Sequence, residues 1–127
     1  MKVLLDTHAL LWWATGDRQL TKKAKAAIAA EDNSVYVSAA SAWEIATKVR
    51  LGKLAWPATA GTVGAYVLRQ AFRPLPISIE HAERAGQLPI DHRDPFDRML
   101  AAQALSEGVS FISADTIFDT YGVSRLW

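Results

Sequence analysis

Short hydrophobic runs alternate with longer amphipathic segments along the chain, which predicts strands separated by helices. The runs are rich in leucine, β-branched or aromatic residues and are bounded by polar or turn residues. We predict strands at 2–5, 34–37, 74–77, 109–112 and 123–127. The segments between them have helical spacing or capping residues at their ends. We predict helices at 7–14, 21–30, 39–51, 60–71, 80–88, 95–107 and 116–121.

Glycine and proline mark the ends of the clearest helices. Gly52 closes the segment 39–51, Pro95 occupies the favoured first position of a helix, and Gly108 follows its last residue. Strands and helices that alternate in a short chain predict an α/β fold with a mainly parallel central sheet flanked by helices. In such a sheet the ligand site lies beyond the carboxyl ends of the strands.

Composition predicts a single compact domain over residues 1–127. Half of the chain is hydrophobic and the charged 21% is dispersed, which excludes a disordered tail. The absence of cysteine excludes zinc fingers, thiol catalysis and disulfide scaffolds, and it favours a reducing cytosol. The longest apolar stretch, 9–14, is far short of the roughly 20 residues that span a bilayer. We therefore expect a cytoplasmic protein without a membrane partner.

The net charge of +1 is low for a protein that attracts nucleic acid by bulk charge. A polyanionic partner would have to meet a local basic patch. The candidates for such contacts are Lys48, Arg50, Lys53, Arg93 and Arg98. For each of them alone, a solvated or ion-paired position on the surface is the more typical role.

Four acids lie at the predicted ends of strands or starts of helices. Asp6 ends the first strand, Glu44 lies in the first turns of the helix after the second, Asp97 is in the first turn of the Pro95 helix, and Asp115 follows the strand 109–112. Each has a structural explanation when taken alone, because acids favour helix N-caps and first turns.

The spacings Ser41–Glu44 and Asp94–Asp97 also resemble capping boxes. Because Asp94 directly precedes Pro95, the role of N-cap is the better interpretation for this residue.

Together, the four acids predict a shared site, because strand ends and the following helix starts lie at one edge of a parallel sheet. Two unit charges about 5 Å apart repel by about 3 kcal/mol at an effective dielectric constant of about 20. Such a cluster retains protons or binds a hard cation, and oxygen ligands suit Mg²⁺ or Mn²⁺. Carboxylate-held Mg²⁺ is typical of phosphoryl chemistry. The residues alone thus point to a metal-dependent phosphodiesterase or phosphatase.

Four stretches of the chain also carry family-like motifs. They are VLLDTHALLW at 3–12, the segment 38–54 with its WEI and GKL, HRDPFDRMLAAQA at 92–104, and ISAD at 112–115 followed by Phe118 and Tyr121. In this order they resemble the PIN-domain ribonucleases of the VapC type, which are toxins of type II toxin–antitoxin systems. The third stretch is the most specific, and the resemblance covers nearly the whole chain.

The resemblance implies an endoribonuclease that cuts RNA with Mg²⁺ or Mn²⁺ and is silenced by an antitoxin. The family's acidic constellation falls on Asp6, Glu44, Asp97 and Asp115. Asp6 and Asp97 would be central ligands, Glu44 would help to orient the attacking water, and Asp115 would hold a second or weaker metal position. A PIN-like α/β/α domain and a homodimer are implied as well.

Several other residues have two interpretations. Thr7 and Ser113 flank the proposed ligands, although turn and cap roles are more typical for both. His8 and His92 suggest acid–base catalysis, which metal-dependent hydrolysis does not require. Adjacent helical residues point about 100° apart, so Trp12 and Trp13 cannot both enter one core, and we expect an exposed apolar patch. The resemblance implies that this patch is covered either by a second copy of the chain in a homodimer or by the antitoxin.

Three alternatives stay open. The first is a phosphatase with Asp6 as nucleophile. Such enzymes usually have a second aspartate two positions later, where this chain has His8. A catalytically inactive PIN-like module would bind RNA or a partner without cutting. In an α/β domain whose acids only cap helices, removal of each acid would lower the stability by about 1 kcal/mol and would leave any activity unchanged.

Overall fold

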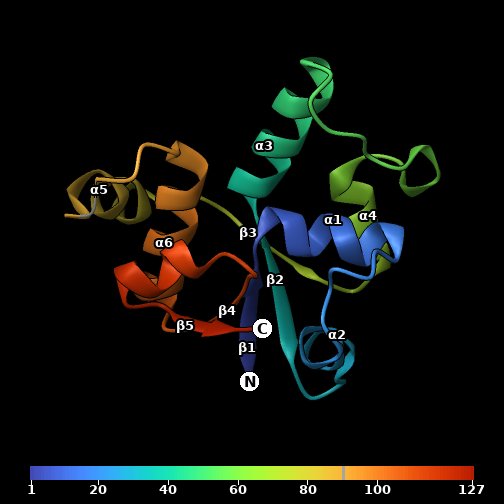
Figure 1. The fold of residues 1–127 in the computed structure, drawn as a ribbon, viewed down its shortest axis with the longest axis horizontal. Helices are drawn as coiled ribbons and strands as arrows, with labels where there is room; N and C mark the ends of the chain where they lie inside the picture. The colour runs from blue at the N-terminus through green and yellow to red at the C-terminus, as the bar shows by residue number, and fades with distance from the viewer. Residues whose placement is uncertain (90) are drawn as a thin grey trace.

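The computed structural model describes residues 1–89 and 91–127, which form a five-stranded, all-parallel sheet of order β3-β2-β1-β4-β5 (Figure 1). This confirms the predicted α/β fold, and the last strand pairs in parallel with β4 at the edge of the sheet. The strands are β1 (Lys2–Leu5), β2 (Ser34–Ser38), β3 (Arg73–Leu75), β4 (Ser110–Ile112) and β5 (Ser124–Leu126).

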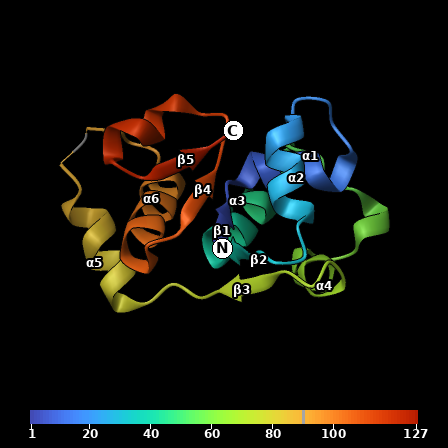
Figure 2. The same cartoon turned by 90° about the horizontal axis from the view of Figure 1, so that it is seen from below.

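Helices cover both faces of the sheet. Figure 2 shows α1, α2 and α4 on one side and α5 and α6 on the other. The α-helices are α1 (Thr7–Thr15), α2 (Lys22–Ala29), α3 (Ala39–Arg50), α4 (Val63–Arg69), α5 (Ile79–Gln87) and α6 (Pro95–Glu107). Two 3₁₀ helices complete the fold, η1 (Ala58–Ala60) and η2 (Thr116–Tyr121). Among the described residues, none of the helices is long and apolar enough to cross a bilayer.

Strand β1 is the centre of the hydrophobic core. Val3, Leu4 and Leu5 are fully buried, because each face of a central parallel strand is covered by helices. Val3 and Leu5 pack into the cluster beneath α1, α2 and α4, and Leu4 packs with Phe111 and the residues of α6 on the opposite face. This continuous apolar run therefore fixes the position of the residue that follows it, Asp6.

Two predicted elements differ from the observed ones. The helix expected at 60–71 is divided, because Gly61 has a φ of 71° and Thr62 starts α4 by accepting a hydrogen bond from the amide of Ala65. The strand expected at 74–77 is the edge strand Arg73–Leu75. It ends where Pro76, which has no amide hydrogen, follows.

Arg98 fastens α5 to the start of α6. Its guanidinium donates to the carbonyl oxygens of Ala85 at 2.8 and 3.0 Å, Leu88 at 2.7 Å and His92 at 3.3 Å. These bonds engage carbonyl groups in the last turn of α5 and in the segment that follows it. Arg98, which the sequence left as a candidate phosphate contact, therefore holds the segment that leads into the proposed site.

We expect Arg98→Met to lower the free energy of unfolding by about 2–4 kcal/mol, because it removes charge-assisted hydrogen bonds and leaves partly buried carbonyls without donors. Urea denaturation measures the change. Arg93→Met is the matched control, since Arg93 is exposed on the same segment, and it should change stability by less than about 0.5 kcal/mol. Equal effects of the two substitutions would show that Arg98 does not hold this segment.

Candidate active site at the carboxyl edge of the sheet

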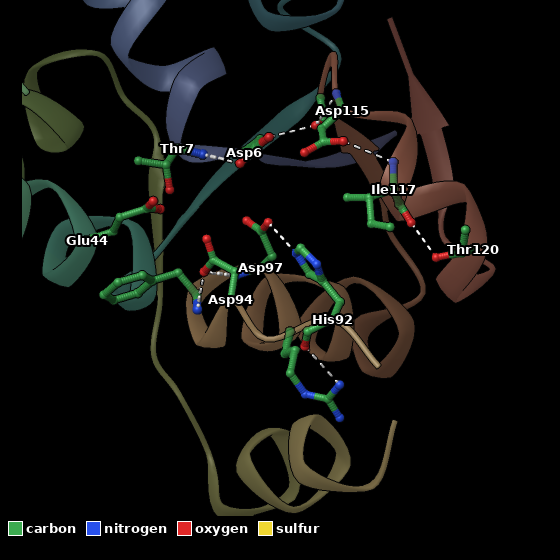
Figure 3. Close-up of polar contacts among 12 residues, drawn as sticks. Asp6, Thr7, Glu44, His92, Asp94, Asp97, Asp115, Ile117 and Thr120 are labelled. Atoms are coloured by element: carbon green, nitrogen blue, oxygen red, sulfur yellow. Dashed lines mark hydrogen bonds and ion pairs between the residues drawn. The ribbon is translucent and has the colours of Figure 1, made fainter. Parts of the chain in front are cut away.

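The four acids predicted from the sequence line one cleft at the carboxyl edge of the sheet. The cleft has a volume of about 350 Å³, and Figure 3 shows Asp6, Glu44, Asp97 and Asp115 around it. They come from the end of β1, from α3, from α6 and from the turn after β4. His8, Trp12, Lys48, Asp94 and Ala114 complete the described lining.

Asp6 is held rigidly between two parts of the fold. Its amide donates to the carbonyl of Ile112, which ties the end of β1 to β4. One carboxylate oxygen caps α1 by accepting from the amide of Thr7 at 2.7 Å, and the other accepts from the hydroxyl of Ser113 at 2.6 Å. The side chain is buried. The capping role and the position in the cleft are therefore compatible.

Glu44 lies in the second turn of α3 with only 3% of its surface exposed, and its carboxylate contacts the ammonium of Lys48 one turn later. The predicted capping box with Ser41 is wrong. Ser38, the last residue of β2, caps α3 by accepting from the amide of Ala40. Ser41 lies further along the helix and accepts a hydrogen bond from the Thr7 hydroxyl at 2.9 Å, which joins α3 to α1.

Asp97 and Asp94 start α6 with different roles. Asp94 is the N-cap, as predicted, and accepts from the amides of Phe96 and Asp97. The side chain of Asp97 does not close a capping box with it. One of its oxygens lies 2.9 Å from Nε2 of His92, whose ring packs edge-on against Tyr121. Sequence reasoning gave His92 little weight, although its place in the HRDPFD motif was a usable signal.

Asp115 is the most open of the four acids. It is exposed and starts η2 by accepting from the amide of Ile117 at 3.0 Å. Its own amide donates to the Ser113 hydroxyl, which in turn donates to Asp6. Ser113 thus links the first and the fourth acid, a function beyond the turn role that its position in the sequence suggests.

The carboxylates are close enough to influence one another. Burial, together with the charges of Asp97 and Glu44, raises the pKa of Asp6 from 3.8 to about 7 against the opposing hydrogen bond from Ser113. Burial also raises the pKa of Asp97, and the neighbouring Asp94 and Glu44 act in the same direction. The cleft therefore concentrates negative charge that the protein neutralises incompletely.

The chemistry of this donor set fits a hard divalent cation, because the ligands would be carboxylate oxygens in a partly buried cleft. In the described part of the chain, no three His, Asp or Glu side chains stand close enough together to hold an ion as they are placed. Lys48 engages Glu44, and His92 engages Asp97. Binding of a cation through both oxygens of Glu44 or of Asp97 would require the release of Lys48 or of His92.

Comparison with known families decides the classification. The profile of the PIN domain family matches residues 3–123. The chain belongs to the PIN domain family. PIN-domain toxins are in general nucleases, and PIN nucleases generally use divalent metals. A search among curated proteins finds no match.

Solved structures share the fold of this PIN domain. VapBC2 from Rickettsia felis, bound to a DNA fragment from its promoter, is 13% identical with a TM-score of 0.71, over 99% of this chain and 98% of that one. FitAcB from Neisseria gonorrhoeae is 23% identical with a TM-score of 0.65, over 98% and 96%. VapC20 from Mycobacterium tuberculosis, a toxin that cleaves the sarcin–ricin loop, is 18% identical with a TM-score of 0.66, over 95% of each chain.

The raised pKa of Asp6 predicts a pH dependence of stability in the absence of divalent ions. Between about pH 4 and pH 7 the unfolded chain releases the Asp6 proton while the folded protein retains it. The stabilisation is complete below this interval and is lost as the pH rises through it, by up to about 4 kcal/mol. Urea unfolding in EDTA measures the loss. Asp6→Asn should remove this part of the fall, and parallel profiles for the two proteins would contradict the assignment.

A second prediction concerns the buried charge of Glu44. Lys48→Met leaves this carboxylate without its cation and should lower the free energy of unfolding by about 1–3 kcal/mol in EDTA. Glu44→Gln in the same chain should restore most of the loss, because the uncompensated charge is then gone. Lys53→Met, at an exposed lysine beyond the end of α3, is the control for the change in net charge. A loss that Glu44→Gln does not repair would argue for a packing role of Lys48.

Proposed function

We propose that this PIN domain is a metal-dependent endoribonuclease that acts as the toxin of a toxin–antitoxin pair. The observation that carries the proposal is the convergence of Asp6, Glu44, Asp97 and Asp115 on one cleft from four parts of the fold. Asp94 lines the cleft as a helix cap, but Glu44 and Asp97 cap no helix and still face the same space. Family membership supports nuclease chemistry at this position.

Asp6 and Asp97 are the proposed central ligands of Mg²⁺, for which Mn²⁺ would substitute. Glu44 completes the set and orients the attacking water, and Asp115 serves a second or weaker position. A bound ion would activate water and stabilise the leaving oxygen in the hydrolysis of an RNA phosphodiester bond. Ser113 holds Asp6 in place for this purpose with a hydrogen bond of 2.6 Å.

Lys48 and His92 hold Glu44 and Asp97 until the ligand set is assembled. The Lys48 side chain is 30% exposed and lies in the lining of the cleft, so an RNA phosphate can reach its ammonium group. Among the described lining residues it is the one lysine or arginine. After the release of Glu44 its charge is available to the substrate, which offsets the repulsion between RNA and the surrounding acids.

Partner proteins are also part of the proposal. Structural neighbours such as VapBC2 were solved as toxin–antitoxin complexes, and we infer a cognate antitoxin and a homodimer for this chain. An apolar groove of about 250 Å³ between α3, α5 and α6 offers surface for such a contact. Trp43 on its rim is 61% exposed. We expect the chain to act as a single domain in the cytoplasm.

The alternative is a PIN-like module that binds RNA or a partner without cutting. It would be favoured by the loss of one of the central acids, and Asp6, Glu44 and Asp97 are all present. Cleavage assays with purified protein distinguish the two functions. Failure to cut structured and unstructured RNA with Mg²⁺ and Mn²⁺, in a folded protein, would favour the binding module.

Asp97→Asn should weaken Mn²⁺ binding at least tenfold in calorimetry and reduce RNA cleavage at least a hundredfold, because it removes a central carboxylate. It should leave the free energy of unfolding unchanged or raise it, since repulsion and burial of charge are relieved. Asp91→Asn, at an exposed acid in the segment before α6, controls for the loss of one negative charge. Unchanged Mn²⁺ binding together with a destabilised Asp97→Asn protein would make Asp97 a structural residue.

A further inference from the structure

One wall of the carboxylate cleft is aromatic. His8 and Trp12, one turn apart on α1, both line the cleft, and their ring centroids lie 5.6 Å apart. On its other side Trp12 contacts Trp127 at the chain terminus, with centroids 5.8 Å apart. Trp12 thus contacts one aromatic ring within the cleft lining and another outside it. The remaining described lining of the cleft is charged, apart from Ala114.

The neighbouring tryptophan has a different environment. Trp13 points toward β3 and α4, where its indole nitrogen donates to the side chain of Gln70 at 3.0 Å and its ring contacts Phe72. Both tryptophans are partly buried and both pack against the same hydrophobic cluster. The difference between them is therefore their direction: Trp12 borders the cleft, and Trp13 has partners on the scaffold.

We propose that Trp12, with His8, is a stacking platform for an unpaired nucleobase of the RNA whose phosphate reaches the carboxylates. The proposal rests on the proposed function and adds a substrate-binding residue to it: the indole of Trp12 would hold a base that is free to leave its neighbours. Bases in a duplex are stacked on their neighbours, whereas unpaired bases can be splayed onto aromatic side chains.

Different parts of the cleft suit the phosphate and the base of a nucleotide. The acids, with Lys48, surround the place where a phosphate would be held, and they offer an uncharged base little apolar surface. The aromatic wall offers that surface, and its stacking is tolerant of base identity because every base has a π-face. The exposed ring of His8 lies between Asp6 and Trp12 in the sequence, so the platform begins directly beside the carboxylates.

Helix geometry places the base close to the cut. Trp12 is six positions after Asp6 along the chain, which is a rise of roughly 9 Å along α1. Stacked nucleotides follow one another at about 3.4 Å, and splayed nucleotides lie further apart. We therefore expect the platform to hold a base at most about three nucleotides from the scissile phosphate.

Equilibrium binding tests the platform without relying on cleavage. The probe is a fluorescently labelled oligouridylate of about six nucleotides, whose bases are unpaired, and the protein carries Asp97→Asn so that the probe stays intact. Trp12→Leu should weaken binding about 5- to 100-fold in this background, as expected for the loss of one base–aromatic stack. Trp13→Leu is the matched control and should change affinity less than about twofold. His8→Ala, at an exposed position, should weaken binding by a smaller factor than Trp12→Leu.

A series of probes with a single abasic position locates the stacked base. One position should weaken binding to the parent protein and have no effect on Trp12→Leu, because the base and the indole then belong to the same interaction. Equal losses for Trp12→Leu and Trp13→Leu, or an unchanged affinity for Trp12→Leu and His8→Ala, would overturn the platform. If Trp12→Leu fails to fold, His8→Ala and the conservative Trp12→Phe, which should keep most of the affinity, carry the same test.

The two proposals fail in different ways. If the wild-type domain cuts no RNA but its binding depends on Trp12 and on a base, the platform is supported and the hydrolytic function is contradicted. If Trp12→Leu changes neither the rate of RNA cleavage nor the affinity for RNA, the hydrolytic function is supported and the platform is contradicted.

Discussion

The structure depends on one constraint: the central strand of a parallel sheet ends with a buried carboxylate. Three apolar residues fix β1 in the core, and Asp6 follows them where β1 is tied to β4. Its position is therefore set by the fold. Because parallel strands deliver the next helices to the same edge, Glu44 and Asp97 come near it, and their charges add to the effect of burial on the pKa of Asp6. The fold creates the repulsion that a cation would relieve.

The sequence was sufficient to predict the strands, the helices and the edge at which the acids meet, because apolar periodicity and the topology of parallel sheets are regular. It was not sufficient to predict which polar side chains contact one another within the cleft. The Lys48–Glu44 and His92–Asp97 contacts depend on rotamers within a common cleft. The capping-box spacing of Ser41 and Glu44 also occurs where another residue, Ser38, is the cap. The divided helix near Gly61 reflects a positive φ that composition alone does not require.

The structural and functional interpretations of the acids do not exclude each other. Asp6 and Asp115 both cap helices, and each uses one oxygen for that bond. A carboxylate has a second oxygen and further lone pairs, so a capping acid can still turn an acceptor toward a cleft. Asp94 satisfies two amides at the start of α6 and thereby leaves the Asp97 side chain free to point into the cleft. Because Asp94 caps the helix, Asp97 is not needed as a cap and can contribute to the cleft.

The contacts inside the cleft also explain how such a domain folds before an ion arrives. Lys48, His92 and Ser113 supply a cation, a ring nitrogen and a hydroxyl to Glu44, Asp97 and Asp6 respectively. Where a cation takes the oxygen that Lys48 or His92 now contacts, part of the binding free energy is spent on displacing that partner. The cleft would therefore hold its ion less tightly than an unpaired set of the same carboxylates. Under the proposed function, Lys48 released from Glu44 would face an incoming phosphate, and ion binding and RNA binding would then be coupled through this side chain.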